Sequence, residues 1–146
     1  MIFLHEPIFS SKEIKYVTEC LKTGWVSTSG KFVSKFERQI SSITNSKYCL
    51  ALNSGTSCLD LSLKLLDVKK DQEIIVPTTT FIAPINSILY NRANPIFMDI
   101  DKFGNLDSDK VIRFIKEETY IKKNFTFNKK TKKKIKALII VHVFGN

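Results

Sequence analysis

The chain has 146 residues, of which 43% are hydrophobic and 25% are charged, which is enough apolar content for one core-bearing domain. It contains no apolar run of about eighteen residues and no basic start of a secretory leader, so neither a membrane span nor a signal peptide is predicted. The three cysteines lack paired spacing, and His5 and His142 lack partners at metal-ligand spacing. We therefore expect a reduced cytoplasmic protein without a metal site.

The net charge of +9 is concentrated in one segment of the chain. Eight lysines and no acid lie between Lys122 and Lys136, which leaves +1 for all other residues. A block of like charge is most often a solvated segment, and Phe125 and Phe127 are the only aromatics within it. We expect a solvent-exposed excursion with a turn at residues 128–131, and no nucleic-acid site. A small basic binding protein acting through this block is the non-enzyme alternative.

The hydrophobic pattern predicts helices and strands in alternation. Ser10 and Glu13 form a capping-box pattern ahead of a helix, Gly24 is placed to end it, and a second helix follows Gly30. The later expected elements are strand 48–52, helix 55–67, strand 73–77, helix 81–91, strand 95–99, helix 107–118 and strand 137–143. This order predicts an α/β fold with a mostly parallel sheet and helices on both faces.

The turn before the expected helix 55–67 has the chemistry of a phosphate site. The backbone N–H groups of Gly55, Thr56 and Ser57 would lie at a helix N-terminus, which carries partial positive charge and unpaired donors. An ordinary hydroxyl cap explains the same residues equally well. The turn alone leaves both interpretations open.

A second turn of the same kind follows the expected strand 73–77. Pro77 and three threonines end this strand, and Pro84 falls in the first turn of the next helix, where its missing N–H is harmless. Phe81 lies at the corner, at the end of a strand, where α/β proteins bind ligands. Its ring is either a core plug or a surface on which a flat ligand stacks.

Together the two turns resemble the DegT/DnrJ/EryC1/StrS family of pyridoxal-phosphate-dependent sugar-nucleotide aminotransferases. Residues 54–59 are similar to the family's S-G-T-x-x-L turn, which holds the cofactor phosphate. Residues 77–83 are similar to its P-x-x-T-[FWY]-x-A corner, whose aromatic residue stacks on the pyridine ring. Segments 23–37, 93–101 and 136–146 match further family motifs in the same order. The chain is identified as a member of this family from about residue 6 to its last residue.

The resemblance implies pyridoxal 5'-phosphate as cofactor, with Gly55 and Thr56 at its phosphate and Phe81 against its ring. Trp25, Ser27 and Gly30 lie in the segment that borders the sugar site in relatives, although Trp25 is equally well explained as a buried anchor. The family's Schiff-base lysine, and the aspartate that pairs with the pyridine nitrogen, come after residue 146. No catalytic residue is therefore assigned.

The resemblance also implies that residues 1–146 form the N-terminal part of a fold-type I large domain, truncated and inactive alone. The parent enzyme would transfer an amino group from glutamate to a nucleotide-linked 4-keto-6-deoxy sugar for surface polysaccharide, as a homodimer. The lysine-rich excursion is similar to the branch that aminates UDP-linked 4-keto-6-deoxy-N-acetylhexosamines. A pyridoxamine-phosphate-dependent sugar dehydratase, with histidine replacing the lysine, and a truncated product without function are the alternatives.

The family's sheet order, 3-2-4-5-6-7-1, adds a prediction about the strands. Strands 73–77, 95–99 and 137–143 should pair with one another. Strand 48–52 should lack its neighbour, and residues 138–141 should form an open apolar edge.

Overall fold

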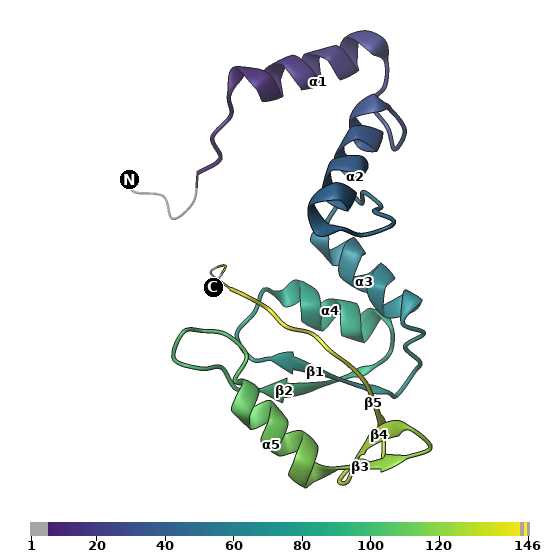
Figure 1. The fold of residues 1–146 in the computed structure, drawn as a ribbon, viewed down its shortest axis with the longest axis vertical. Helices are drawn as coiled ribbons and strands as arrows, with labels where there is room; N and C mark the ends of the chain where they lie inside the picture. Colours follow the sequence, from purple (N-terminus) through teal and green to yellow (C-terminus); the bar gives the residue numbers. More distant parts are fainter. Residues whose placement is uncertain (1–5, 144, 146) are drawn as a thin grey trace. The chain divides into compact units, whose positions relative to one another are not determined.

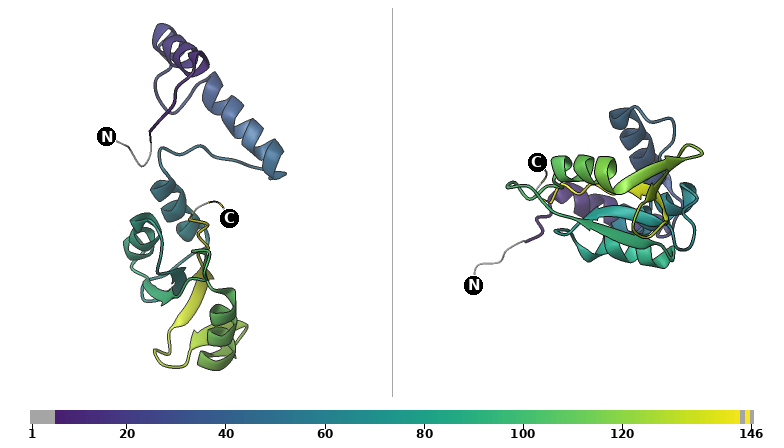
Figure 2. Two further views of the ribbon diagram at one scale, coloured as in Figure 1. Left: turned by 90° about the vertical axis from the view of Figure 1, so that its left-hand side faces the viewer. Right: turned by 90° about the horizontal axis from the view of Figure 1, so that it is seen from below.

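The computed structural model describes residues 6–143 and 145 of the chain (Figure 1). Contacts divide these residues into two compact units, one ending at Ala51 and the other beginning at Leu52. Figure 2 shows both units from two further sides. Phe144 and Asn146, which belong to the last matched motif, and His5 lie outside the described residues.

The N-terminal unit contains helices α1 (Ser11–Thr23) and α2 (Lys31–Thr44). The predicted capping box is present, because the Glu13 carboxylate accepts from the Ser10 N–H at 2.6 Å and the Ser10 hydroxyl accepts from the Lys12 N–H at 3.2 Å. Gly24 ends α1 in the left-handed region, at φ 73°. Both predictions from the local pattern are confirmed.

The two helices touch through aromatic and charged side chains. The rings of Tyr16 and Phe32 lie 4.9 Å apart between centroids, and Lys31 forms an ion pair with Glu19. Neither helix buries any residue. Their apolar side chains are therefore largely uncovered, among them Ile14, Val17, Leu21, Phe36 and Ile43.

The prediction of a strand at residues 48–52 is wrong for the described structure, where this segment belongs to no helix or strand. The burial pattern of a strand persists, since Cys49 and Ala51 are half-buried while Tyr48 and Leu50 are exposed. A strand exists only by pairing, and no described segment pairs with this one. Instead the Ala51 N–H donates to the Glu37 carboxylate at 2.9 Å.

The second unit is built on one five-stranded sheet of order β2-β1-β5-β4-β3. Strands β2 (Asn94–Met98), β1 (Glu73–Pro77) and β5 (Lys134–Leu138) run parallel and form the centre of the fold. This confirms the predicted pairing of these three strands. β5 nevertheless occupies residues 134–138 rather than the predicted 137–143.

The lysine-rich excursion is part of the sheet, which corrects its prediction as a solvated loop. Strands β3 (Thr119–Lys122) and β4 (Phe125–Asn128) form an antiparallel hairpin, and β4 also pairs with β5. The predicted turn is present, because the Asn128 side-chain oxygen accepts from the Lys130 N–H at 2.9 Å. The lysines divide into an exposed and a half-buried set; the exposed ones are Lys122, Lys123, Lys129, Lys130 and Lys132.

Helices cover both faces of the parallel strands, as predicted (Figure 1). Helices α3 (Gly55–Leu65) and α4 (Ile82–Tyr90) lie on the face that receives Ile74 and Val76. Helix α5 (Ser108–Glu118) lies on the opposite face, which receives Ile75. Successive residues of β1 thus enter opposite cores, which explains the unbroken apolar run of this strand.

The described residues give information on membrane-spanning helices and on metal sites. No helix in ranges 6–143 and 145 is both long and apolar enough to cross a membrane. In the same part of the chain, no three histidine, cysteine or acidic side chains gather where they could hold a metal ion.

Candidate functional site

A cavity of about 510 Å³ in the second unit brings together Gly55, Thr56 and Phe81. Gly55 and Thr56 begin α3, and Phe81 directly precedes α4. The third wall is the segment that continues from β5. The other residues around the cavity are Leu59, Thr80, Ala83, Pro84, Ile139, Ile140, Val141 and His142. The three residues predicted to bind the cofactor therefore lie around one space.

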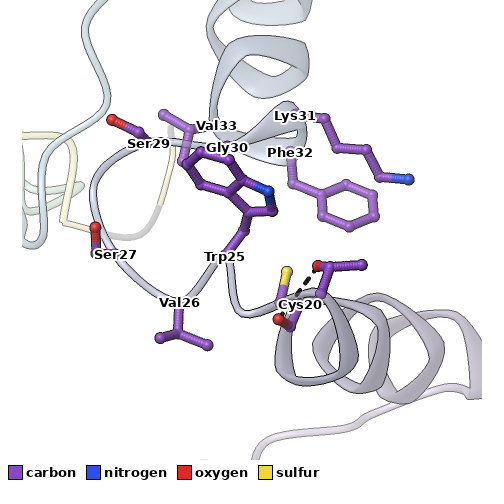
Figure 3. Close-up of a pocket in the computed structure, with 10 residues that line it drawn as sticks. Cys20, Trp25, Val26, Ser27, Ser29, Gly30, Lys31, Phe32 and Val33 are labelled. Atoms are coloured by element: carbon purple, nitrogen blue, oxygen red, sulfur yellow. Dashed lines mark hydrogen bonds between the residues drawn. The ribbon is translucent and has the colours of Figure 1, made fainter.

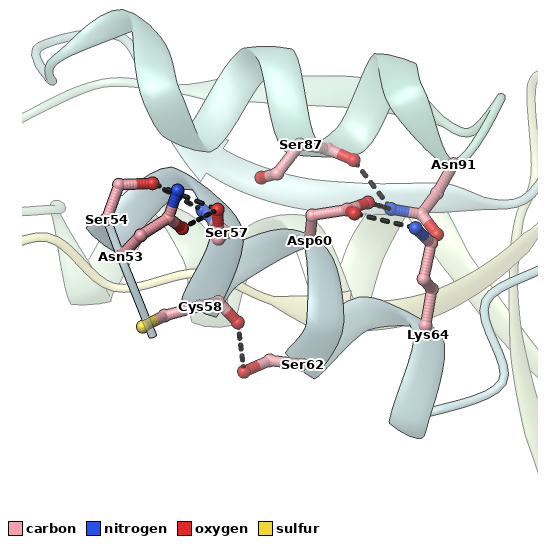
Figure 4. A network of polar contacts seen from close by, with 9 residues as sticks. All are labelled: Asn53, Ser54, Ser57, Cys58, Asp60, Ser62, Lys64, Ser87 and Asn91. Atoms are coloured by element: carbon pink, nitrogen blue, oxygen red, sulfur yellow. Dashed lines mark hydrogen bonds and ion pairs between the residues drawn. The ribbon is translucent and has the colours of Figure 1, made fainter. Parts of the chain in front are cut away.

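The beginning of α3 is capped and yet keeps free donors. The Ser54 hydroxyl accepts from the Ser57 N–H at 3.1 Å, and the Ser57 hydroxyl donates to Asn53 at 2.8 Å (Figure 4). Within the described chain, the N–H groups of Gly55 and Thr56 have no hydrogen-bond partner. Unpaired N–H groups at the positive end of a helix form an anion site.

The beginning of α4 presents an aromatic ring and a hydroxyl to the same cavity. Phe81 is 85% exposed, which excludes its interpretation as a core plug. No side chain caps this helix, and Pro84 is buried in its first turn. The Thr80 hydroxyl oxygen is buried without a partner among the described residues. A buried hydroxyl without a partner is costly, so a ligand that reached it would gain a hydrogen bond.

A polar network connects α3 to the end of α4 (Figure 4). The Asp60 carboxylate accepts from Lys64 at 2.7 Å and from the Asn91 amide at 2.9 Å, and Asn91 also donates to the Ser87 carbonyl at 2.8 Å. The hydrogen bond from Lys64 lowers the pKa of Asp60 below its ordinary value. These contacts fix the two helices, and so the two helix N-termini, relative to each other.

A separate cavity of about 460 Å³ lies in the N-terminal unit and contains Trp25, Ser27 and Gly30 (Figure 3). Trp25 is 60% exposed, so it is not a buried anchor. Gly30 has φ 150°, a backbone conformation that residues with a Cβ rarely adopt. Lys31 and Phe32 also line this cavity. The three predicted sugar-site residues are therefore grouped around one space.

Two residues of the first cavity received no role from the sequence, Thr80 and His142. His142 directly follows the apolar residues 138–141, and Thr80 lies shortly after the end of β1, in the region where such folds place ligand contacts. That position was the available signal. Three consecutive threonines do not show which of them faces a ligand, and the family motif at residues 136–146 includes His142 without giving it a role.

Comparison with known proteins gives the family. The sequence profile of the DegT/DnrJ/EryC1/StrS aminotransferase family matches residues 7–146. GDP-perosamine synthase of Escherichia coli O157:H7 is 33% identical over 143 residues, which are 98% of this chain and 35% of that protein. The chain thus spans about a third of the length of this curated relative.

Solved structures agree with the sequence comparison. The aminotransferase from Psychrobacter cryohalolentis is 32% identical with a TM-score of 0.68, over 77% of this chain and 29% of that one. The E. coli GDP-4-keto-6-deoxy-D-mannose-3-dehydratase with bound hydrated PLP is 25% identical with a TM-score of 0.74, over 98% of this chain and 34% of that one. The chain belongs to the DegT/DnrJ/EryC1/StrS aminotransferase family.

Proposed function

We propose that the chain is the part of a sugar-nucleotide aminotransferase that binds the phosphate and the ring of pyridoxal 5'-phosphate. The observation that carries this proposal is the cavity where the partnerless N–H groups of Gly55 and Thr56 lie near the exposed ring of Phe81. The proposal extends to the whole protein, of which residues 1–146 would be one part of the large domain.

The residues present fit the cofactor. The two N–H groups at the positive end of α3 match a phosphate dianion, and the Phe81 ring offers an apolar face to an aromatic ring. The partnerless hydroxyl of Thr80 supplies a further donor. Pyridoxal phosphate, when bound, supplies the electron sink for amino-group chemistry, while the protein binds and orients it.

The cavity of the N-terminal unit is assigned to the nucleotide-linked sugar. The exposed indole of Trp25 offers an apolar surface, Ser27 offers a hydroxyl, and Gly30 keeps the loop in its unusual conformation. Lys31, although paired with Glu19, adds a positive charge to this cavity. The match to a GDP-perosamine synthase supports a nucleotide-linked sugar as substrate.

The proposal for the whole protein also covers its substrates, its assembly and its location. The amino donor is glutamate, the acceptor is a nucleotide-linked 4-keto-6-deoxy sugar for surface polysaccharide, and the protein is a cytoplasmic homodimer. The resemblance of the lysine-rich insertion, which forms the β3–β4 hairpin, favours the UDP-linked branch. The second candidate is a sugar dehydratase, favoured by the dehydratase whose structure matches 98% of the chain.

Cofactor binding tests the proposal directly. Gly55→Asp places a negative charge at the phosphate position, where a Cβ meets no atom within 4 Å, and an acid at the start of a helix is itself favourable. We expect this variant to fold and to lose pyridoxal phosphate binding in equilibrium dialysis. Ser11→Asp introduces the same charge at the start of α1 and should bind like the wild type.

Phe81→Ala should weaken binding about ten-fold, because stacking on an aromatic side chain contributes roughly 1–3 kcal/mol. The ring is exposed, so its loss should hardly change the free energy of unfolding. Wild-type affinity in both Gly55→Asp and Phe81→Ala would refute the proposal.

The chain alone should not transfer an amino group. No lysine lines the cavity among the described residues, so borohydride reduction with the cofactor should give no single stoichiometric lysine label. Purified chain with UDP-4-keto sugar, glutamate and cofactor should yield no amino sugar. A uniquely labelled lysine, mapped by mass spectrometry, would contradict this assignment. Scattered labels on the exposed lysines would not.

A further inference from the structure

The candidate cofactor cavity contains one titratable side chain among the described residues that line it, the imidazole of His142. The remaining lining groups come from α3, the α4 corner and the segment after β5, and they are apolar side chains, backbone groups or threonine hydroxyls. His142 is therefore the one side chain of this lining, among the described residues, that can bring an imidazole N–H to an anion.

The chain path brings His142 beside the α4 corner. The Ile139 N–H donates to the Ile75 carbonyl at 2.8 Å, so the chain beyond β5 continues alongside β1. The two segments then reach the cavity together, one ending in Thr80 and Phe81 and the other in His142. The carboxyl ends of neighbouring parallel strands commonly share one ligand.

The surroundings of His142 favour an anion. The N-termini of α3 and α4 both open into the cavity, and each contributes partial positive charge. The imidazole of a histidine has an N–H to donate in either protonation state. The imidazole is exposed, and its side chain makes no hydrogen bond within the described chain, so no structural contact already uses it.

Building on the proposed function, we infer that His142 is a further cofactor-binding residue, whose imidazole donates a hydrogen bond to an anionic oxygen of pyridoxal phosphate. The partnerless hydroxyl of Thr80 is an independent indication that a polar ligand occupies this space. A metal-ligand role is not supported, because no group of potential metal ligands forms around His142 among the described residues.

Nuclear magnetic resonance tests the inference on the intact chain, because His5 and His142 are its only histidines. Pyridoxal phosphate should shift the ring signals of His142 and leave those of His5 unchanged, with His5→Gln providing the assignment. Separate titrations with pyridoxal and with inorganic phosphate show whether the contact is made to the ring oxygen or to the phosphate. A shift of the His142 signals in either titration supports the inference.

Affinity provides a second measurement. His142→Leu should weaken pyridoxal phosphate binding about ten-fold, because it removes the N–H donor while keeping an apolar side chain of similar size. His142→Gln, which keeps an N–H donor, should bind pyridoxal phosphate with an affinity between those of the wild type and His142→Leu.

The outcomes separate this inference from the proposed function. If the cofactor binds and Gly55→Asp abolishes binding, while His142 signals do not move and His142→Leu binds normally, the inference is wrong and the proposed function stands. If the wild-type chain binds no pyridoxal phosphate, both are wrong.

Discussion

A buried carboxylate, that of Glu73, should make the stability of the sheet depend on a single amide. Glu73 begins β1 and is 4% exposed, and Asn128 ends β4 and is 7% exposed. The Asn128 side-chain N–H donates to the Glu73 carboxylate at 3.0 Å. Because a buried charge is tolerated only when it is paired or hydrogen-bonded, removing the amide should cost more than one ordinary contact.

The magnitude follows from two contributions. A hydrogen bond to a charged group contributes roughly 1.5–3 kcal/mol, and the turn contact from the Asn128 side-chain oxygen to the Lys130 N–H contributes about 1 kcal/mol more. Asn128→Ala should therefore lower the free energy of unfolding by about 3 kcal/mol, measured by urea denaturation. Asn86→Ala is the matched control, because the Asn86 side chain makes no hydrogen bond in the described structure. It should change the free energy of unfolding by about 0.5 kcal/mol or less.

A double-mutant cycle isolates the charge. In the Glu73→Gln background the buried partner is neutral, so the same Asn128→Ala change should cost clearly less. Asn128→Asp keeps the turn acceptor but places two carboxylates together, and should destabilise more than Asn128→Ala at neutral pH. A cost for Asn128→Ala below about 1 kcal/mol, or equal costs in both backgrounds, would refute the reasoning.

Three further predictions concern the helix caps and the lysines. The hydrogen bond from Ser10 lowers the pKa of Glu13. The α1 cap should therefore be fully present above about pH 4.3 and be lost as the pH falls through the lowered pKa. Amide exchange at Ser10 should show this loss, and Glu13→Gln should remove the pH dependence. Gly24→Ala should destabilise α1 by about 1 kcal/mol, because φ is 73° there, whereas Gly55→Ala should have little effect; equal losses of helicity by circular dichroism would contradict this. At about 150 mM salt the chain should bind duplex and single-stranded DNA only at the non-specific level of roughly 10⁻⁴–10⁻⁶ M. Tighter binding that disappears when Lys122, Lys123, Lys129, Lys130 and Lys132 are changed to Gln would show a dedicated site.

The helices and the parallel strands were predictable because their signals are local. Ser10 and Glu13 are three residues apart and cap their helix without help from the rest of the chain. The apolar run 74–76 requires cover on both faces, and α3, α4 and α5 supply it. Such signals depend on spacing along the chain, which the sequence contains directly.

Two of the wrong predictions concern strand pairing, which spacing along the chain does not contain. Residues 48–52 alternate as a strand does, but no described segment pairs with them as a strand. The prediction for the β3–β4 hairpin was wrong in the opposite way, because its many lysines indicated a solvated excursion although the segment forms paired strands. Tyr120 and Phe127 stack at 5.5 Å, and the Lys134 ammonium lies 3.1 Å from the centre of the Phe125 ring. Pairing brought together aromatics that the linear sequence separates.

The two interpretations of the turn at residues 53–57 are not alternatives, because they use different atoms. The cap uses the Ser57 N–H, which the Ser54 hydroxyl satisfies. The proposed cradle uses the N–H groups of Gly55 and Thr56, which the cap leaves without partners in the described chain. A helix that needed a ligand to satisfy all its first donors would fray when empty, whereas one that satisfied them all internally could not bind. Dividing the donors lets α3 begin at the same residue with or without an anion, so the site can be ordered before a ligand arrives.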